Sequence, residues 1–166
     1  KVRHFGVSNQ NPMMMELLKT AVKQPLKVNQ LQLSAAFTPS FEAGFHVNME
    51  GPKAAVRDGS VFEYCRLTDT VIQAWSVLQY GYFKGNFVGR EEFAALNHVL
   101  NDLAKKYQVT PTAIALAWVL RYPGKMQAVI GTTNPQHVLE AGKAATVTLT
   151  RKEWYQVYLA AGNDLP

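Results

Sequence analysis

The stretch Lys1-Val2-Arg3-His4-Phe5-Gly6-Val7-Ser8-Asn9 decides the fold, because it indicates a short buried strand that ends in two polar residues. The same pattern, an apolar strand with small or polar residues at its end, recurs at residues 28–31, 71–76 and 128–133. In a barrel of parallel strands the ligand lies over the carboxyl ends of the strands. Four such ends in one chain therefore predict half of a ligand-binding face.

Helical patterns alternate with these strands along the whole chain. Apolar positions at helical spacing follow Pro12, fill 61–67 and 91–107, and follow the cap-like residues Thr110, Asn134 and Thr150. Strands are expected at 28–33, 69–76 and 128–130. This order favours a parallel sheet with outer helices, in one partial domain over residues 1–166. Residues 34–59 and 77–90 lack clear periodicity and are expected to be ligand-facing loops.

Composition limits the class of protein. The chain has 166 residues, of which 48% are apolar and 17% charged, and no apolar run approaches the roughly 20 residues that a membrane span needs. The formal charge of +5 is scattered along the sequence, which argues against a nucleic-acid partner. The single cysteine, Cys65, excludes an internal disulfide and fits the cytoplasm. We expect no membrane and no nucleic acid among the partners.

Three polar residues at strand ends are candidate ligand-binding groups. Ser8 and Asn9 have two readings, simple turn chemistry or side chains that bind an amide or phosphate at the barrel mouth. Gln30 lies within an apolar strand, where its amide needs a partner. That partner is either a neighbouring strand or the amide of a ligand.

Two further residues carry the same ambiguity. Trp75 ends its strand beside Ser76, so it is either a core residue or a flat surface for a planar ring. Lys84 lies between glycines, either as a solvated cation or as a lid over a pyrophosphate.

The segment Gly131-Thr132-Thr133-Asn134-Pro135 joins a strand to a helix. The first turn of that helix offers free backbone N–H groups to a phosphate, although a helix cap alone explains the residues equally well. His137, one turn further, either packs on the surface or adds charge beside the phosphate.

Standard catalytic and metal-binding motifs are missing from the sequence. We find no G-x-S-x-G elbow, no H-E-x-x-H pair and no P-loop, and the histidines are too dispersed to suggest a metal site. Residues 1–166 therefore supply no catalytic set and no metal ligands.

Taken together, the segments resemble the C-terminal half of the aldo/keto reductase family. The matching pieces are VRHFGVSN (2–9), VNQLQLS (28–34), IQAWSVL (72–78) and AVIGTTNPQHVLEA (128–141), in the family's order. The tail LTRKEWYQVYLAAGNDLP (149–166) looks like the closing helix of the bacterial oxidoreductase branch. The resemblance implies about strands 5 to 8 of a (β/α)8 TIM barrel that binds NADPH and reduces a small carbonyl substrate to an alcohol.

The resemblance also implies roles for individual residues. Ser8, Asn9 and Gln30 would hold the nicotinamide carboxamide, and Trp75 would stack on the nicotinamide ring. Ser76, Val77, Leu78 and Lys84 would follow the pyrophosphate, and the adenosine 2′-phosphate end would be lined by Gly131, Thr132, Thr133, His137 and Glu140.

The sequence departs from the family pattern in three places. Val77 replaces a proline, His137 stands where many members carry arginine, and Ala141 stands where many carry asparagine. A neutral histidine offers no fixed charge to a 2′-phosphate, so NADH is the alternative cofactor. The family's catalytic Asp, Tyr, Lys and His would precede Lys1, so this segment alone is expected to be inactive.

Half a barrel leaves two sheet edges and an inner face exposed. We therefore expect a fragment that joins a complementary N-terminal half or associates with itself. Two competing functions stay open at this level. One is a non-catalytic nucleotide-binding or assembly module derived from the family, and the other is an open-sheet α/β domain with only a superficial likeness to it.

Overall fold

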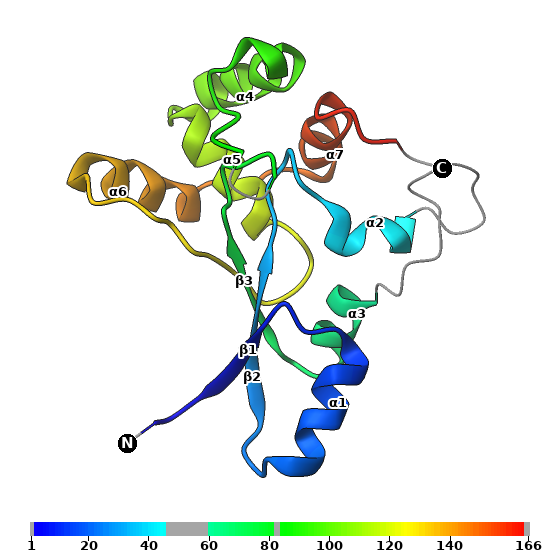
Figure 1. Cartoon of the computed structure of the whole chain (residues 1–166). Coiled ribbons are helices and arrows are strands. Elements are labelled where there is room, and N and C mark those ends of the chain that lie inside the picture. The colour runs from blue at the N-terminus through cyan, green and yellow to red at the C-terminus, as the bar shows by residue number, and fades with distance from the viewer. Residues whose placement is uncertain (1, 46–59, 82–83, 165–166) are drawn as a thin grey trace.

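The computed structural model describes residues 2–45, 60–81 and 84–164 as a sequence of strands and helices in alternation (Figure 1). The first part contains the strand β1 (Phe5–Ser8), the helix α1 (Pro12–Ala21), β2 (Leu26–Gln32), α2 (Pro39–Phe45), α3 (Val61–Leu67) and β3 (Val71–Trp75). The second part contains α4 (Ala94–Tyr107), α5 (Pro111–Leu120), β4 (Met126–Ala128), α6 (Pro135–Gly142) and α7 (Arg151–Ala160). Two short 3-10 helices, Glu91–Phe93 and Lys143–Thr146, precede α4 and follow α6.

The strands form one four-stranded parallel sheet in the order β1-β2-β3-β4. Each strand pairs with the next strand of the sequence, and helices make the crossover connections. Sequential parallel strands with outer helices are the repeating unit of a (β/α)8 barrel. The chain is therefore an α/β domain that forms half of a TIM barrel, as expected.

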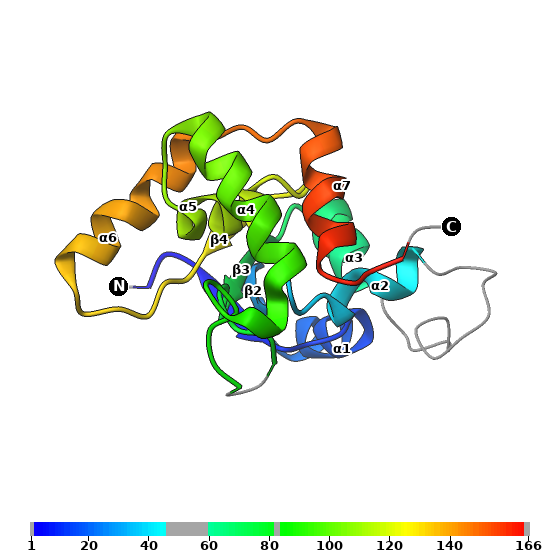
Figure 2. The same cartoon turned by 90° about the horizontal axis from the view of Figure 1, so that it is seen from above.

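The two faces of the sheet differ in chemistry. Leu31, Ile72 and Ala74 point into the hydrophobic core, where they meet residues of α3, α4, α5 and α7. Because side chains alternate along a strand, Gln30 and Gln73 point to the opposite face and are only half-buried. In Figures 1 and 2, α6 lies towards the opposite end of the molecule from α1, α2 and α3.

A cluster of aromatic rings at the centre of the core fixes the last helix. The rings of Trp118 on α5 and Trp154 on α7 stack with centroids 4.8 Å apart and planes 9° apart. Each indole Nε1 donates to the backbone carbonyl of the other residue at 3.0 Å. Phe41 of α2 is buried in the same cluster, with its ring centroid 5.5 Å from that of Tyr122.

The helix starts confirm the capping pattern of the sequence. The side chains of Asn11, Thr110 and Asn134 each accept a backbone N–H of the first turn, and a proline follows each cap. Thr150 forms a full capping box with Glu153. Local side-chain chemistry therefore sets where these four helices begin.

Three expectations from the sequence need correction. The first strand is an exposed edge rather than buried, because β1 pairs with β2 alone. The last strand covers Met126–Ala128 instead of 128–130, and Val129 and Ile130 are more than a third exposed. The segment expected as a loop after β2 contains α2, because Phe41 enters the core. Of the expected ligand-facing loops, residues 46–59 and 82–83 lie outside the described residues.

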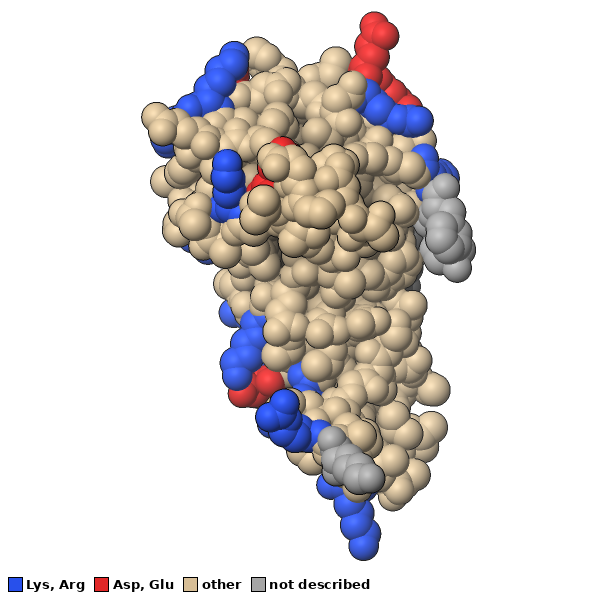
Figure 3. All heavy atoms as spheres, turned by 90° about the vertical axis from the view of Figure 1, so that its left-hand side faces the viewer, with Lys and Arg blue, Asp and Glu red and all other residues tan. Residues whose placement is uncertain are grey.

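Charge on the surface is dispersed. Figure 3 views the molecule from the left-hand side of Figure 1, where a broad uncharged area lies between Lys and Arg side chains at the upper corners and others along the lower end.

Candidate nucleotide-binding site

A corner at the carboxyl end of β1 brings two distant segments together. Asn9 has a left-handed backbone conformation, with φ of 53°, and its N–H donates to the carbonyl of Gln30 at 2.9 Å. Its side-chain Oδ1 accepts from the indole Nε1 of Trp75 at 3.4 Å. Asparagine tolerates this conformation better than most residues. The corner thus turns the chain out of β1 while it aims the Asn9 amide at Trp75.

Asn29 holds this corner from behind, and the sequence reasoning missed it. Its side chain is fully buried, and Nδ2 donates to the carbonyl of Gln10 at 2.8 Å and contacts the Met15 sulfur at 3.5 Å. The N–H of Gln10 donates to Asn29 Oδ1 at 3.5 Å. An asparagine beside Gln30 in an apolar strand was the available signal.

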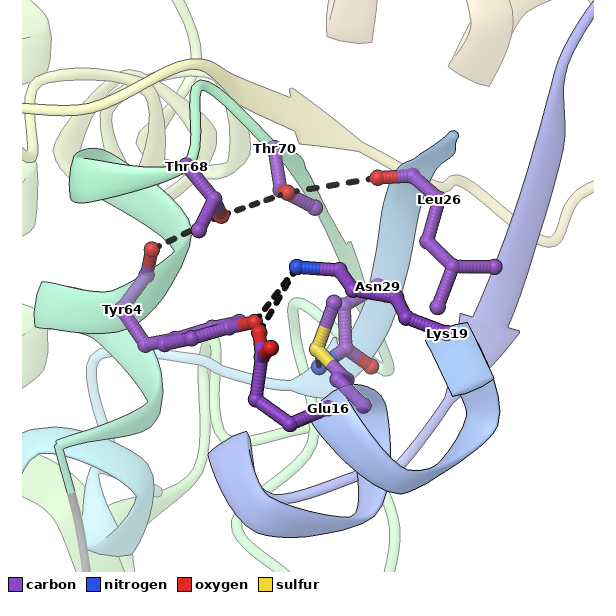
Figure 4. Close-up of polar contacts among 8 residues, drawn as sticks. Glu16, Lys19, Leu26, Asn29, Tyr64, Thr68 and Thr70 are labelled. Carbon is purple, nitrogen blue, oxygen red and sulfur yellow. Dashed lines mark hydrogen bonds and ion pairs between the residues drawn. The ribbon is translucent and has the colours of Figure 1, made fainter. Parts of the chain in front are cut away.

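The helix behind the corner is tied to the neighbouring helix. Lys19 of α1 donates to Tyr64 of α3 at 2.6 Å and to Glu16 at 2.8 Å, as Figure 4 shows. Thr68 bridges the Tyr64 carbonyl to Thr70 in the same view. These contacts join α1, α3 and the start of β3 on the helical side of the sheet.

The Gln30 side chain has found a cross-strand partner. Its Nε2 donates to Gln73 Oε1 at 2.8 Å, so one of the two readings from the sequence is realised in the structure. Its register partner on β1 is Ser8, whose hydroxyl donates weakly to the Gln30 carbonyl at 3.4 Å. Ser8, Asn9 and Gln30 therefore lie side by side at one end of the sheet.

A cavity of about 640 Å³ opens beside this corner. Its size is typical of a small-molecule site. The loop after β3, the segment after β4 and the helices α5 and α6 all contribute to it, with the lining residues Trp75, Ser76, Val77, Leu78, Gln79, Asn86, Val88, Thr112, Leu116, Val129, Ile130, Gly131, Thr132, His137, Glu140 and Ala141.

The loop after β3 forms one wall of the cavity. Ser76 has φ of 52°, so the chain turns sharply directly after Trp75. Gln79 follows, and its side-chain Oε1 is buried with no hydrogen-bond partner in the described part of the chain. A buried acceptor without a donor is costly. A ligand that enters the cavity and donates to Gln79 would remove that cost. The sequence did not indicate this role for Gln79.

The opposite wall is the start of α6. Asn134 caps the helix through the N–H of Gln136 at 2.9 Å, and Thr132 Oγ1 accepts from the Asn134 N–H at 3.2 Å. The Thr132 hydroxyl also lies 3.4 Å from Nδ1 of His137. Glu140 accepts from Gln136 at 2.9 Å. This wall carries polar and acidic side chains, with no Lys or Arg among the described residues that line it.

The structure thus brings most of the candidate residues together. Eight of them line the cavity. Ser8, Asn9 and Gln30 lie beside it, and Asn9 contacts the cavity residue Trp75. Thr133 and Lys84 are exposed and do not line it, and the stem of Lys84 lies over Gly81. Gln79, Asn86 and Thr112 are cavity residues that the sequence reasoning did not name.

Other sites of chemistry are not evident in the described ranges. Cys65 is buried in α3, and burial raises the pKa of its thiol to about 11, so it stays protonated. No group of three metal-binding side chains occurs among the described residues. Within the same ranges, none of the helices combines the length and apolar character that a membrane crossing requires.

Comparison with known proteins agrees with the geometry. The chain is 33% identical to 6-dehydroglucose reductase of Agrobacterium fabrum over 99% of its own length and 49% of that protein. It is 30% identical to oxidoreductase YdhF of Escherichia coli, over 100% of this chain and 50% of that protein. The chain therefore spans about half the length of these curated relatives.

Solved structures show the same fold. A thermostable aldo-keto reductase, Tm1743, matches 95% of this chain and 48% of its own with a TM-score of 0.67 at 20% identity. An aldo-keto reductase complexed with NADPH matches 95% of this chain and 42% of its own, with a TM-score of 0.65 at 17% identity. The model of the aldo/keto reductase family matches residues 1–158. The chain belongs to the aldo/keto reductase family.

Proposed function

We propose that the chain carries the cofactor-binding half of an NAD(P)H-dependent oxidoreductase that reduces a carbonyl to an alcohol. The observation that supports this most is the contact between Asn9 and Trp75 at the edge of the cavity. It places a carboxamide and a flat indole together, which are the two groups suited to a nicotinamide. When bound, the nicotinamide would supply the hydride.

The cavity and the corner beside it together offer regions that fit the parts of a dinucleotide. Ser8, Asn9 and Gln30 are proposed to bind the nicotinamide carboxamide, with Trp75 against the ring. The backbone of 76–78 and the buried acceptor of Gln79 line the middle, where the ribose hydroxyls can donate to that acceptor. The segment 131–140 is proposed to hold the adenosine end, where the positive end of the α6 dipole favours a phosphate.

The preferred cofactor is proposed to be NADPH, with NADH as the alternative. An aldo-keto reductase with a similar fold has been solved in complex with NADPH, which favours the phosphorylated form. In this chain the titratable side chains among the cavity residues are His137 and Glu140. A carboxylate suits a free ribose hydroxyl, and a histidine suits a phosphate only when charged. Both cofactors therefore belong in the binding assay.

The chain is proposed to need a complementary half-barrel, or a second copy, to complete the reductase. Large apolar side chains are exposed at both ends of the sheet, with Met13 and Leu17 of α1 at 69% and 63% and Leu139 of α6 at 67%. In a closed barrel these two helices would each meet a further helix. Proton donation to the carbonyl is assigned to the complementary half, so this chain alone is expected to bind cofactor without turnover.

Fluorescence titration tests the proposal directly. NADPH or NADH is added to the full chain and the emission of its tryptophans is followed. Trp75 lines the cavity, whereas Trp118 and Trp154 are buried in the core. Quenching is expected in the native chain and should be largely lost in Trp75→Phe. If Trp75→Phe is quenched as strongly as the native chain, the stacking role is wrong. Light scattering of the same sample tests self-association.

The proposed compartment is the cytoplasm. The support for it is the single cysteine, which is buried with a raised pKa and forms no disulfide within the chain.

A further inference from the structure

Three glutamines form a chain of amides across the open face of the sheet. Gln30, Gln73 and Gln127 occupy paired register positions on β2, β3 and β4. Gln30 Nε2 donates to Gln73 Oε1 at 2.8 Å, and Gln73 Nε2 donates to Gln127 Oε1 at 2.9 Å. All three amides therefore run in the same direction. We call this row of side chains the glutamine ladder.

The ladder ends at the corner that holds Ser8 and Asn9. Ser8 is the register partner of Gln30 on the side away from Gln73. Because Gln30 uses its Nε2 toward Gln73, its Oε1 is the atom left to accept, and none of the described residues donates to it. The orientation of the Gln30 amide is thus decided by Gln73.

We infer that Gln73 is a positioning residue, which holds the Gln30 amide so that its Oε1 accepts from the –NH2 of the nicotinamide carboxamide. The inference rests on the proposed function. A free glutamine amide can turn by 180°, and the turned amide would point its own –NH2 at the –NH2 of the ligand. Gln73 opposes that second orientation before the ligand arrives, because a turned Gln30 would set its own oxygen against Gln73 Oε1, and preorganisation of this kind raises affinity.

Two ligands separate positioning from general stability. NADPH carries the nicotinamide, whereas 2′-phospho-ADP-ribose is the same molecule without it. Calorimetric titration of the full chain gives both dissociation constants. In the native chain NADPH should bind the tighter of the two, because the corner contributes only to NADPH.

Substitutions at one position then test the direction of the ladder. Gln73→Met keeps the size and removes the acceptor, and it should weaken NADPH binding about tenfold while 2′-phospho-ADP-ribose binds as before. Gln73→Glu keeps an acceptor for Gln30 Nε2 and should restore most of the NADPH affinity. Gln156→Met on the exposed side of α7 is the matched control and should change neither constant.

The outcomes that oppose the inference are distinct. If Gln73→Met weakens the binding of both ligands equally, Gln73 has a role in stability alone and the inference is overturned. Unchanged NADPH binding in Gln73→Met also overturns it. So does a Gln73→Glu chain that binds NADPH as weakly as Gln73→Met. A native chain that binds 2′-phospho-ADP-ribose as tightly as NADPH keeps the adenosine site and overturns the positioning role. A native chain that binds neither ligand overturns the proposed function itself, and the inference with it.

Discussion

The indole Nε1 of Trp75 lies 3.4 Å from the side-chain oxygen of Asn9, although 66 positions separate the two residues in the sequence. The contact joins the end of β3 to the turn after β1 across the intervening strand. It makes the orientation of the indole depend on the conformation of that turn. The first prediction tests this dependence.

Replacing Asn9 by glycine should separate binding from stability. Glycine at position 9 adopts φ of 53° without strain, so the free energy of unfolding of Asn9→Gly should change little. The variant lacks the oxygen that Trp75 contacts, so its NADPH affinity should fall about tenfold. Asn9→Ala loses the same contact and also costs about 1 kcal/mol in the left-handed conformation. Urea unfolding and titration of both variants give the two quantities. Equal stability of both variants would argue against the strain.

Replacing Asn29 by leucine should loosen the same turn from behind. Asn29→Leu keeps the volume but leaves the carbonyl and N–H of Gln10 without their partner, which costs about 2–3 kcal/mol in the free energy of unfolding. NADPH affinity should fall as well, because Gln10 directly follows Asn9 in the same turn. The control is Asn11→Ala, which removes the cap of α1 and costs about 1 kcal/mol. A similar loss of affinity in both variants would show fraying of α1 as the cause.

Replacing His137 by arginine should shift the cofactor preference. A guanidinium carries a permanent charge and can pair with a 2′-phosphate through two hydrogen bonds, so His137→Arg should raise NADPH affinity about tenfold and leave NADH affinity nearly unchanged. Gln156→Arg, which adds the same charge on α7, is the control. If both arginine variants favour NADPH equally, the gain comes from net charge and His137 does not face the 2′-phosphate.

Stability should fall in acid because of Glu153. Burial opposes its charge, but hydrogen bonds from Lys106, Thr150 and Tyr107 prevail and lower its pKa from 4.5 to about 2. Since the folded pKa lies below the unfolded one, the stabilisation is complete above about pH 4.5 and is lost as the pH falls toward about 2. The two values correspond to about 3 kcal/mol.

Urea unfolding as a function of pH checks this contribution. Glu153→Gln should be less stable than the native chain near neutral pH, and the difference should shrink through the acid range. A difference that stays constant down to the lowest pH would mean that the lost contacts of the side chain, and not its charge, explain the effect.

Local chemistry explains which parts of this fold could be predicted. Pro12, Thr110 and Asn134 mark helix starts because a cap acts on the N–H groups of its own first turn. The prediction that β1 is buried was wrong, because the burial of a strand depends on how many strands flank it, and β1 has one neighbour in the sheet. The α2 helix was hidden because its short sequence shows little periodicity, and its Phe41 is stabilised by distant aromatic rings.

The candidate site divides in the same way. Trp75 and Gln30 could be named because a large ring or an amide in a short apolar strand is conspicuous. Gln73 could not, since its importance comes from the register between β2 and β3, which places it opposite Gln30. Gln79 became notable only when the fold buried its oxygen beside the cavity.

The glutamine ladder has a consequence for whatever closes over this face. A face of hydrocarbon would attract any apolar surface, in many alignments of similar energy. A row of amides favours one alignment over the others. A covering segment that shifts by one residue places carbon against the amide oxygens and leaves buried hydrogen-bonding groups without partners. The ladder therefore contributes little to the strength of packing on this face, but it favours one alignment of the surface that packs there.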